Sequence, residues 1–247
     1  MKKTIESVFA QDFSAFEYIV VDGDSTDGSK EYIDRFADKL SYSVSERDNG
    51  VYDAMNKGIA KATGTFIMFL NSGDYFVHPN VVTDLNKYFK TGTSDVYYGN
   101  IQITDQAGNV SCLQYPASLT LDFLNRATIN HQASIIKSSL FQEIGLYDTN
   151  FNLAADYAFF LKCFFYGKHF EHINKEVVNY QLDGASSIQR GEYKSQMNEA
   201  WKQIIPDYMN RLYNNNKEHE SLMNQRILRW AKSINNQYRR FRNFWKK

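Results

Sequence analysis

Residues 65–76 read TFIMFLNSGDYF, an apolar run that ends in a polar turn. Phe66–Leu70 has the length and composition of a buried strand. The turn Asn71–Asp74 follows at once and places a single carboxylate, that of Asp74, just past the strand end. Ligands of open α/β sheets bind outside the carboxyl ends of the strands. An acid at that position typically holds a divalent metal together with a phosphate.

The same pattern of alternating elements extends on both sides of this run. Hydrophobic periodicity predicts helices at 4–10, 29–40, 50–62 and 80–89, and strands at 18–21, 42–45 and 65–70. This order predicts an α/β fold with a mainly parallel, doubly wound sheet and helices on both faces. Short strands at 95–98, 101–104 and 110–113 predict a small antiparallel part. Further elements are expected to be helices at 121–125, 141–144 and 156–166, a strand at 175–181, and helix from 192 onward.

The start of the chain departs from this architecture. A doubly wound domain usually opens with a strand, whereas residues 4–10 predict a helix. We therefore expect the first strand, which is often central, to be absent. We divide the chain into an N-terminally truncated α/β domain, residues 1–190, and a helical extension, residues 191–247.

Composition indicates a folded cytoplasmic protein. Of 247 residues, 43% are hydrophobic, which excludes a disordered chain. The two cysteines, Cys112 and Cys163, lack metal-ligand spacing and favour a reducing compartment. No signal peptide is apparent, and no segment approaches the roughly 18 apolar residues that a membrane span needs.

A net charge of zero conceals a basic tail. Residues 217–247 carry nine Lys or Arg and two Glu, so the rest of the chain is mildly acidic. Apolar and aromatic residues between Met223 and Trp245 recur on one helical face. Two interpretations stay open: peripheral binding to an anionic membrane surface, or packing on the domain or on a second copy in a homodimer. An acidic body makes nucleic acid a poorer partner.

Acidic residues gather where the predicted strands end. Asp22 ends the first strand, Asp48 follows the second and Asp74 the third, while Asp156 lies at the start of a later helix. In a parallel sheet the first three meet at one edge, where a carboxylate can accept a hydrogen bond from a ribose or base, or hold a cation. Each alone is commonly a cap or turn residue, but three at successive strand ends favour a nucleotide site.

Three motifs resemble family 2 glycosyltransferases. They are YIVVDGDSTDG at 18–28, DNGVYDAMNKG at 48–58 and FLNSGD at 69–74, and the resemblance covers about residues 3–190. It is closest to the bacterial subgroup that builds capsule, exopolysaccharide or O-antigen. The resemblance implies a GT-A fold, a UDP- or GDP-sugar donor, Mg or Mn, and inversion at the anomeric carbon. It also implies a hexosyltransferase-like reaction with a hydroxyl of a glycan or lipid-linked acceptor.

The resemblance also implies roles for individual residues. Asp156 matches the catalytic base, and Asp74 the metal ligand. His131 and Gln132 match the acceptor or diphosphate side, although a structural histidine is an equal alternative. The donor-binding residues implied by the resemblance are Asp22, Asp24, Asp48, Asn71, Ser72 and Gly73. Residues 183–187 resemble a late loop over the donor phosphates, or else a surface turn.

Two departures from the family pattern leave an alternative open. Asn71 and Gly73 stand where many relatives have Asp, and Ala155 replaces the first acid of the pair that Asp156 ends. With the first strand also expected to be absent, a non-catalytic, nucleotide-sugar-binding or scaffold relative is the alternative function. A nucleotidyltransferase would need a glycine-rich, basic phosphate loop near the start, and none is present.

Overall fold

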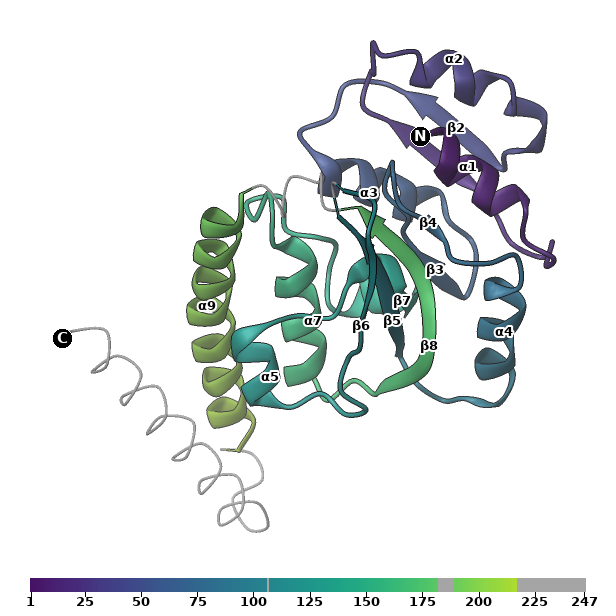
Figure 1. Cartoon of the computed structure of the whole chain (residues 1–247). Coiled ribbons are helices and arrows are strands. Elements are labelled where there is room, and N and C mark those ends of the chain that lie inside the picture. The colour runs from purple at the N-terminus through teal and green to yellow at the C-terminus, as the bar shows by residue number, and fades with distance from the viewer. Residues whose placement is uncertain (106, 182–188, 217–247) are drawn as a thin grey trace. The chain divides into compact units, whose positions relative to one another are not determined.

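The computed structural model describes residues 1–105, 107–181 and 189–216 (Figure 1). The chain divides into two compact units, Met1–Trp201 and Lys202–Lys247. The expected domain boundary after residue 190 falls at the beginning of helix α9 (Arg190–Asn216). The basic tail at 217–247 and the late loop at 183–187 lie outside the described residues.

The first part of the chain alternates helices with two parallel strands. Its elements are α1 (Lys2–Phe9), β1 (Ile19–Asp22), α2 (Ser29–Asp34), the 3-10 helix η1 (Ala37–Lys39), β2 (Tyr42–Ser45) and α3 (Val51–Lys61). β1 and β2 pair in parallel, as expected for strands joined by a helix. Ile5, Val20 and Ile33 bring α1 and α2 together against β1. The helix predicted at 29–40 ends at Asp34, and η1 follows after a break at Phe36.

A second, six-stranded sheet forms the centre of the domain. Its order is β3-β7-β5-β8-β4, and β6 pairs with β5. The strands are β3 (Phe66–Met68), β4 (Tyr75–Phe76), β5 (Val96–Thr104), β6 (Val110–Leu113), β7 (Ser134–Lys137) and β8 (Phe170–Gln181). β5 and β8 are parallel, and the other pairs are antiparallel. The α/β class is confirmed, with an antiparallel part larger than the sequence indicated.

β5 is one strand where two were predicted, at 95–98 and 101–104. The register against β8 shifts between Gly99 and Ile101, so an irregularity rather than a turn separates the two halves. A Cβ on Gly99 would lie 2.3 Å from Val177 Cγ2 and 2.9 Å from the Lys175 carbonyl oxygen. Glycine is therefore required by the close approach of β8, although in the sequence it resembles a breaker.

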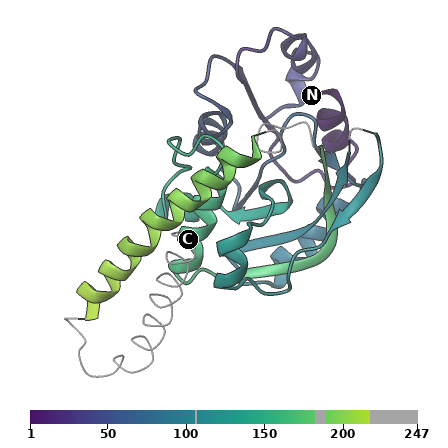
Figure 2. The same cartoon turned by 60° about the vertical axis from the view of Figure 1, so that its left-hand side comes forward.

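Helices cover both faces of this sheet (Figures 1 and 2). α4 (Val81–Thr91) packs Val81 and Leu85 against Tyr97 and Ile101 of β5. Helix α7 (Ala155–Phe165) lies on the side of the other face (Figures 1 and 2). It is buried along most of its length, because it is apolar on nearly all sides. The remaining short helices are α5 (Leu121–Arg126), η2 (His131–Ala133) and α6 (Leu140–Glu143). Within the described residues, no helix combines the length and apolarity needed to cross a membrane.

Candidate active site

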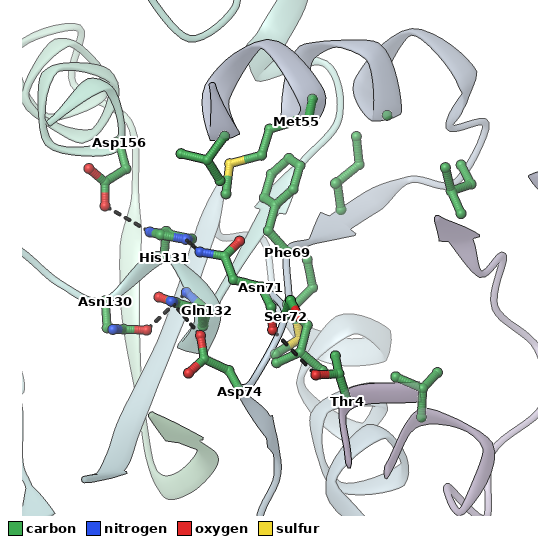
Figure 3. A pocket seen from close by; sticks show the side chains of 18 of the residues that line it. Thr4, Met55, Phe69, Asn71, Ser72, Asp74, Asn130, His131, Gln132 and Asp156 are labelled. Atoms are coloured by element: carbon green, nitrogen blue, oxygen red, sulfur yellow. Dashed lines mark hydrogen bonds and ion pairs between the residues drawn. The ribbon is translucent and has the colours of Figure 1, made fainter. Parts of the chain in front are cut away.

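Most of the predicted site residues line one cavity of about 1330 Å³ in the first unit (Figure 3). β1 and β2 bring Asp22 and Asp48 to it, the turn after β3 brings Asp74, and the start of α7 brings Asp156. Asn71, Ser72, His131 and Gln132 also line it, whereas Asp24 and Gly73 do not. Asp24 has a φ of 65°, the left-handed conformation of a turn residue.

The turn after β3 is held by the first helix. The Thr4 hydroxyl accepts a hydrogen bond from the Gly73 amide at 3.0 Å and lies 3.5 Å from the Asn71 carbonyl oxygen. Gly73 has a φ of 102°, a conformation that favours glycine and allows the turn to close with the Asp74 amide on the Asn71 carbonyl. The first helix therefore fixes where the Asp74 carboxylate stands.

Asp74 is buried, with 4% of its surface exposed, and both of its oxygens accept hydrogen bonds. Gln132 Nε2 donates to Oδ2 at 2.8 Å, and the Gln181 amide donates to Oδ1 at 3.0 Å. Gln132 and Gln181, which are far from Asp74 in the sequence, therefore both donate to its carboxylate. A buried carboxylate needs such hydrogen bonds, because it has lost its contact with water.

The short helix η2 connects the two acids of the site. Asn130 caps it, because its Oδ1 accepts from the amides of Gln132 (2.9 Å) and Ala133 (3.2 Å). Its first residue, His131, places Nδ1 2.9 Å from Asp156 Oδ2. Its second residue, Gln132, reaches Asp74 instead. Adjacent residues of one turn thus fix two carboxylates that are 82 positions apart in the chain.

Asp156 is surrounded by donors rather than acting as a helix cap, a position that Ala154 occupies. Besides His131, the Tyr52 hydroxyl lies 2.8 Å from Oδ1, and the Tyr157 amide donates to the same atom at 2.8 Å. Burial, and then the charge of Asp156, raise the pKa of Tyr52 well above its usual value, so its hydroxyl stays protonated and can donate.

The tautomer of His131 follows from its two neighbours. Asn71 Nδ2 lies 3.2 Å from His131 Nε2 and can only donate, so Nε2 accepts and the ring proton is on Nδ1, toward Asp156. Figure 3 shows Asp156, His131 and Asn71 in one line of contacts. The strand-end turn is thereby connected to the acid at the start of α7.

Asp22 and Asp48 line the side of the cavity that the sequence predicts to bind the nucleotide. Asp22 Oδ2 accepts from the Ser45 hydroxyl at 2.6 Å and from the Ser25 amide at 3.0 Å. Burial disfavours the charged form of Asp22, but these hydrogen bonds outweigh it and hold the pKa of the carboxyl below its usual value. A Cβ on Gly23 would lie 2.5 Å from Asp48 Oδ2, so the two acidic loops are in close contact.

A hard divalent cation fits the oxygen donors beside Asp74. Gln132 Oε1 is buried, and no hydrogen-bond partner for it occurs among the described residues. It belongs to the side chain that contacts Asp74, so an amide oxygen and a carboxylate are available together. No group of three His, Cys, Asp or Glu residues able to hold a metal occurs in the described ranges, so one carboxylate would act with substrate oxygens.

Sequence reasoning missed three residues that hold the site together. Tyr52 lies within a motif that was recognised, but its contact with Asp156 spans 104 positions. Thr4 and Gln181 contact the turn after β3 from the first helix and from the end of β8. The place of Tyr52 in that motif is the signal that the sequence offers for it, whereas its burial is known only from the structure.

Comparisons with known proteins identify the family of the chain. The profile of the family described as Glycosyl transferase family 2 matches residues 1–144. A glycosyltransferase of Mycobacterium tuberculosis, described as uncharacterised, is 36% identical over 167 residues, which are 66% of this chain and 63% of that protein. A PGL/p-HBAD biosynthesis glycosyltransferase of Mycobacterium bovis is 30% identical over 165 residues, 65% of this chain and 62% of its own. The chain thus spans less than two thirds of these relatives.

Two of the solved structures with the same fold contain a bound ligand. S. aureus TarS 1-349 in complex with UDP-GlcNAc has a TM-score of 0.61 at 17% identity, over 95% of this chain and 76% of that one. The mannosyltransferase PcManGT of Pyrobaculum calidifontis, in complex with GDP-Man and Mn2+, has a TM-score of 0.58 at 16% identity, over 98% and 78%. These likenesses confirm the expected fold.

Proposed function

Because this chain belongs to glycosyl transferase family 2, we propose that it transfers a sugar from a nucleoside diphosphate to an acceptor hydroxyl with inversion. UDP-GlcNAc and GDP-Man, the ligands named for the two structural neighbours, support a donor of this class. The PGL/p-HBAD relative supports a glycan or lipid-linked acceptor in cell-surface synthesis.

The contact of η2 with both acids carries this proposal. A transferase needs its base and its diphosphate site at a fixed separation, because the attacking and leaving oxygens lie on opposite sides of the anomeric carbon. His131 and Gln132 are neighbours in the chain and contact Asp156 and Asp74 respectively. A rigid, capped turn therefore sets that separation.

In the proposed reaction Asp156 is the general base. The acceptor oxygen attacks the anomeric carbon, the bond from that carbon to the diphosphate oxygen breaks, and the acceptor proton passes to the Asp156 carboxylate. The nucleoside diphosphate leaves with the bonding electron pair. His131 and Tyr52 keep the carboxylate oriented by hydrogen bonds to its two oxygens.

The donor is bound at the other end of the cavity. Asp22 and Asp48 accept hydrogen bonds from the nucleoside, and the turn Asn71–Asp74 faces the diphosphate. Asp74 and Gln132 Oε1, which has no hydrogen-bond partner in the described part of the chain, would hold Mg²⁺ or Mn²⁺, as the Mn2+ of the mannosyltransferase neighbour suggests. When bound, such a cation neutralises charge on the leaving diphosphate.

Substitution of the base tests the proposal. Asp156→Asn should lower turnover of the donor, measured as nucleoside diphosphate release with Mn²⁺, by about 10²-fold or more. Calorimetry should show unchanged donor affinity. Gln142→Glu, at an exposed site, is the control. Donor binding without turnover in the unmodified chain would instead favour the non-catalytic alternative, and turnover that survives in the Asn variant would exclude Asp156 as the base.

The proposed peripheral membrane location depends on the sequence of residues 217–247. The basic, aromatic face predicts that the chain sediments with vesicles of anionic lipid and not with neutral ones. A chain that ends before residue 217 should stay in the supernatant. Equal sedimentation of both chains would leave packing on the domain or on a second copy as the explanation of the tail.

A further inference from the structure

The segment that leads into the candidate base has no regular secondary structure. Residues 144–154 connect α6 to α7 and form neither a helix nor a strand. Asp156 lies in the first turn of α7, so the position of this segment decides where its carboxylate stands. Main-chain groups that have no partner in a helix or a sheet need partners elsewhere. In this segment, side chains of α3 and α9 provide them.

Asn56 of α3 holds the beginning of the segment at Tyr147. Asn56 Nδ2 donates to the Tyr147 carbonyl at 2.9 Å, and the Tyr147 amide donates to Asn56 Oδ1 at 3.0 Å. One side-chain amide thus binds both main-chain groups of a residue that is 91 positions away. Neither Asn56 nor Tyr147 is among the residues that line the cavity. Any influence of Asn56 on the reaction therefore passes through other residues.

Tyr52 holds the end of the segment from the same face of α3. Its hydroxyl lies 3.0 Å from the Leu153 carbonyl oxygen and 2.8 Å from Asp156 Oδ1. Tyr52 and Asn56 are four positions apart, so they lie one above the other on the helix surface. Gln196 of α9 completes the arrangement, because its Oε1 accepts from the Leu153 amide at 2.9 Å. Side chains therefore contact both main-chain groups at each end of the segment.

The Tyr147 ring connects the clamp at Asn56 with the base. It packs on the Tyr52 ring, with centroids 5.5 Å apart, and edge-on against Phe159 of α7 at 5.4 Å. Tyr52 contacts Asp156 directly, and Phe159 lies within one turn of Asp156 in the same helix. Only 2% of the surface of Tyr147 is exposed. Because protein interiors are closely packed, a shift of Tyr147 displaces both neighbours of the base.

The adjacent face of α3 holds a different part of the site. Asp53 Oδ2 accepts from the Asn49 amide at 3.0 Å. Lys57 Nζ donates to the Arg47 carbonyl at 3.0 Å. These two contacts fix the loop that carries Asp48, to which we assign the nucleoside. A change on the face that binds the segment before α7 leaves both contacts in place, so it should not disturb the donor.

We propose that Asn56 is a positioning residue, which sets the orientation of the Asp156 carboxylate through the main chain of Tyr147. It binds neither the donor nor the acceptor. Asn56 belongs to the motif at 48–58, whose acid Asp48 lies on the donor side, so one motif serves both halves of the site. The inference rests on the proposed function, because it takes Asp156 as the group that accepts the proton.

A double-variant cycle tests the inference. Asn56→Ala should lower kcat about tenfold or more, because a misplaced base reacts slowly. The readout is nucleoside diphosphate release with Mn²⁺, with UDP-glucose and GDP-mannose as probes. Calorimetry with UDP and GDP should show unchanged affinity. In the Asp156→Asn background, Asn56→Ala should lower the residual turnover no further, because the carboxylate that it positions is absent.

Two further variants control for stability. Ser94→Ala also removes two hydrogen bonds of a side chain outside the cavity, those with Glu171 at 2.8 Å and His169 at 3.0 Å. It should lower the Tm by a similar amount and leave kcat unchanged. Asn56→Asp keeps the acceptor for the Tyr147 amide and loses the donor, so its kcat should lie between those of Asn56→Ala and the unmodified chain. It replaces Asn56→Ala in the cycle if that variant does not fold.

Several outcomes would overturn the inference. An unchanged kcat in Asn56→Ala would do so, as would an equal loss in Ser94→Ala. A further tenfold loss in the Asp156→Asn background would show that the two residues act independently. Weaker UDP and GDP binding by Asn56→Ala would show that α3 moves as a whole. Failure of the proposed base is recognised separately, because turnover would then survive in Asp156→Asn alone.

Discussion

At the scale of single residues, His131 has two separate contacts, and substitutions can divide them. In His131→Asn, the amide nitrogen is two bonds from Cβ, as Nδ1 of histidine is. This variant therefore keeps a hydrogen-bond donor to Asp156. In His131→Gln, the side-chain amide reaches the position of the histidine Nε2. This variant therefore keeps only the contact with Asn71. If His131 orients the base, His131→Asn should retain more turnover than His131→Gln, whose kcat should fall about 10²-fold with little change in KM.

The comparison of these two variants separates positioning from packing. Both remove the ring and should lose similar stability, so melting temperatures serve as the control. A structural histidine would give two variants with the same kcat. The same result would follow if Nδ1 donated to a group other than Asp156, which the 2.9 Å contact argues against.

Gly23 provides a second prediction at this scale. Its Cβ would meet the end of the Asp48 side chain at 2.5 Å, and a flexible carboxylate can move aside. Gly23→Ala should therefore leave the Tm almost unchanged but weaken nucleoside diphosphate binding about tenfold, since one charged hydrogen bond is misplaced. Calorimetry with UDP and GDP measures the loss. Gly191→Ala, where nothing lies within 4 Å, should bind normally.

At the scale of elements, an ion pair connects helix α4 to strand β8. Asp84 accepts from Lys175 Nζ at 2.6 Å and from Lys87 Nζ at 2.7 Å. These two contacts lower the pKa of Asp84 to about 2. A carboxyl whose pKa is depressed on folding stabilises the fold above its unfolded pKa, about 4, and the contribution is lost as pH falls toward 2.

The expected result is a pH-dependent loss of stability. Asp84→Asn should lower the free energy of unfolding by about 1 kcal/mol at pH 7, because the pair is partly exposed. The difference from the unmodified chain should disappear between pH 4 and pH 2. Urea unfolding at several pH values measures it. Lys87→Met, which removes a contact within α4, should cost less than Lys175→Met, which removes the contact between α4 and β8. A reversed order would contradict the connecting role.

Element boundaries show where local sequence information is sufficient. Amphipathic helices such as α3 were predicted nearly to the residue because periodicity is a local property. The first part of β8, FEHIN, is mostly polar and was not predicted as a strand; it becomes one because it pairs with the first half of β5. The two-residue β4 likewise exists only through its pairing with β8. Pairing with a distant strand decides whether such segments form strands, and local sequence patterns do not predict that pairing.

At the scale of the whole molecule, the candidate site was predictable as a set of acids but not as a network. Turns at successive strand ends identified Asp22, Asp48 and Asp74. All three line one cavity, although β3 lies in a different sheet from β1 and β2. The contacts that orient the acids come from elsewhere: Tyr52 reaches Asp156 across 104 positions, and Gln181 reaches Asp74 across 107. Neither residue type is diagnostic, so only the folded chain reveals their roles.

The contact between Gln132 and Asp74 allows a prediction about metal binding. Gln132→Glu replaces the donor to Asp74 Oδ2 by a second carboxylate, so two buried like charges face each other. The variant should melt several degrees below the unmodified chain in chelator, and Mn²⁺ should restore its Tm, because a cation between two carboxylates relieves their repulsion. Differential scanning fluorimetry over a Mn²⁺ titration measures both effects. Gln142→Glu, on the exposed side of α6, should show neither, whereas a Gln132→Glu variant that Mn²⁺ does not rescue would place the cation away from Asp74.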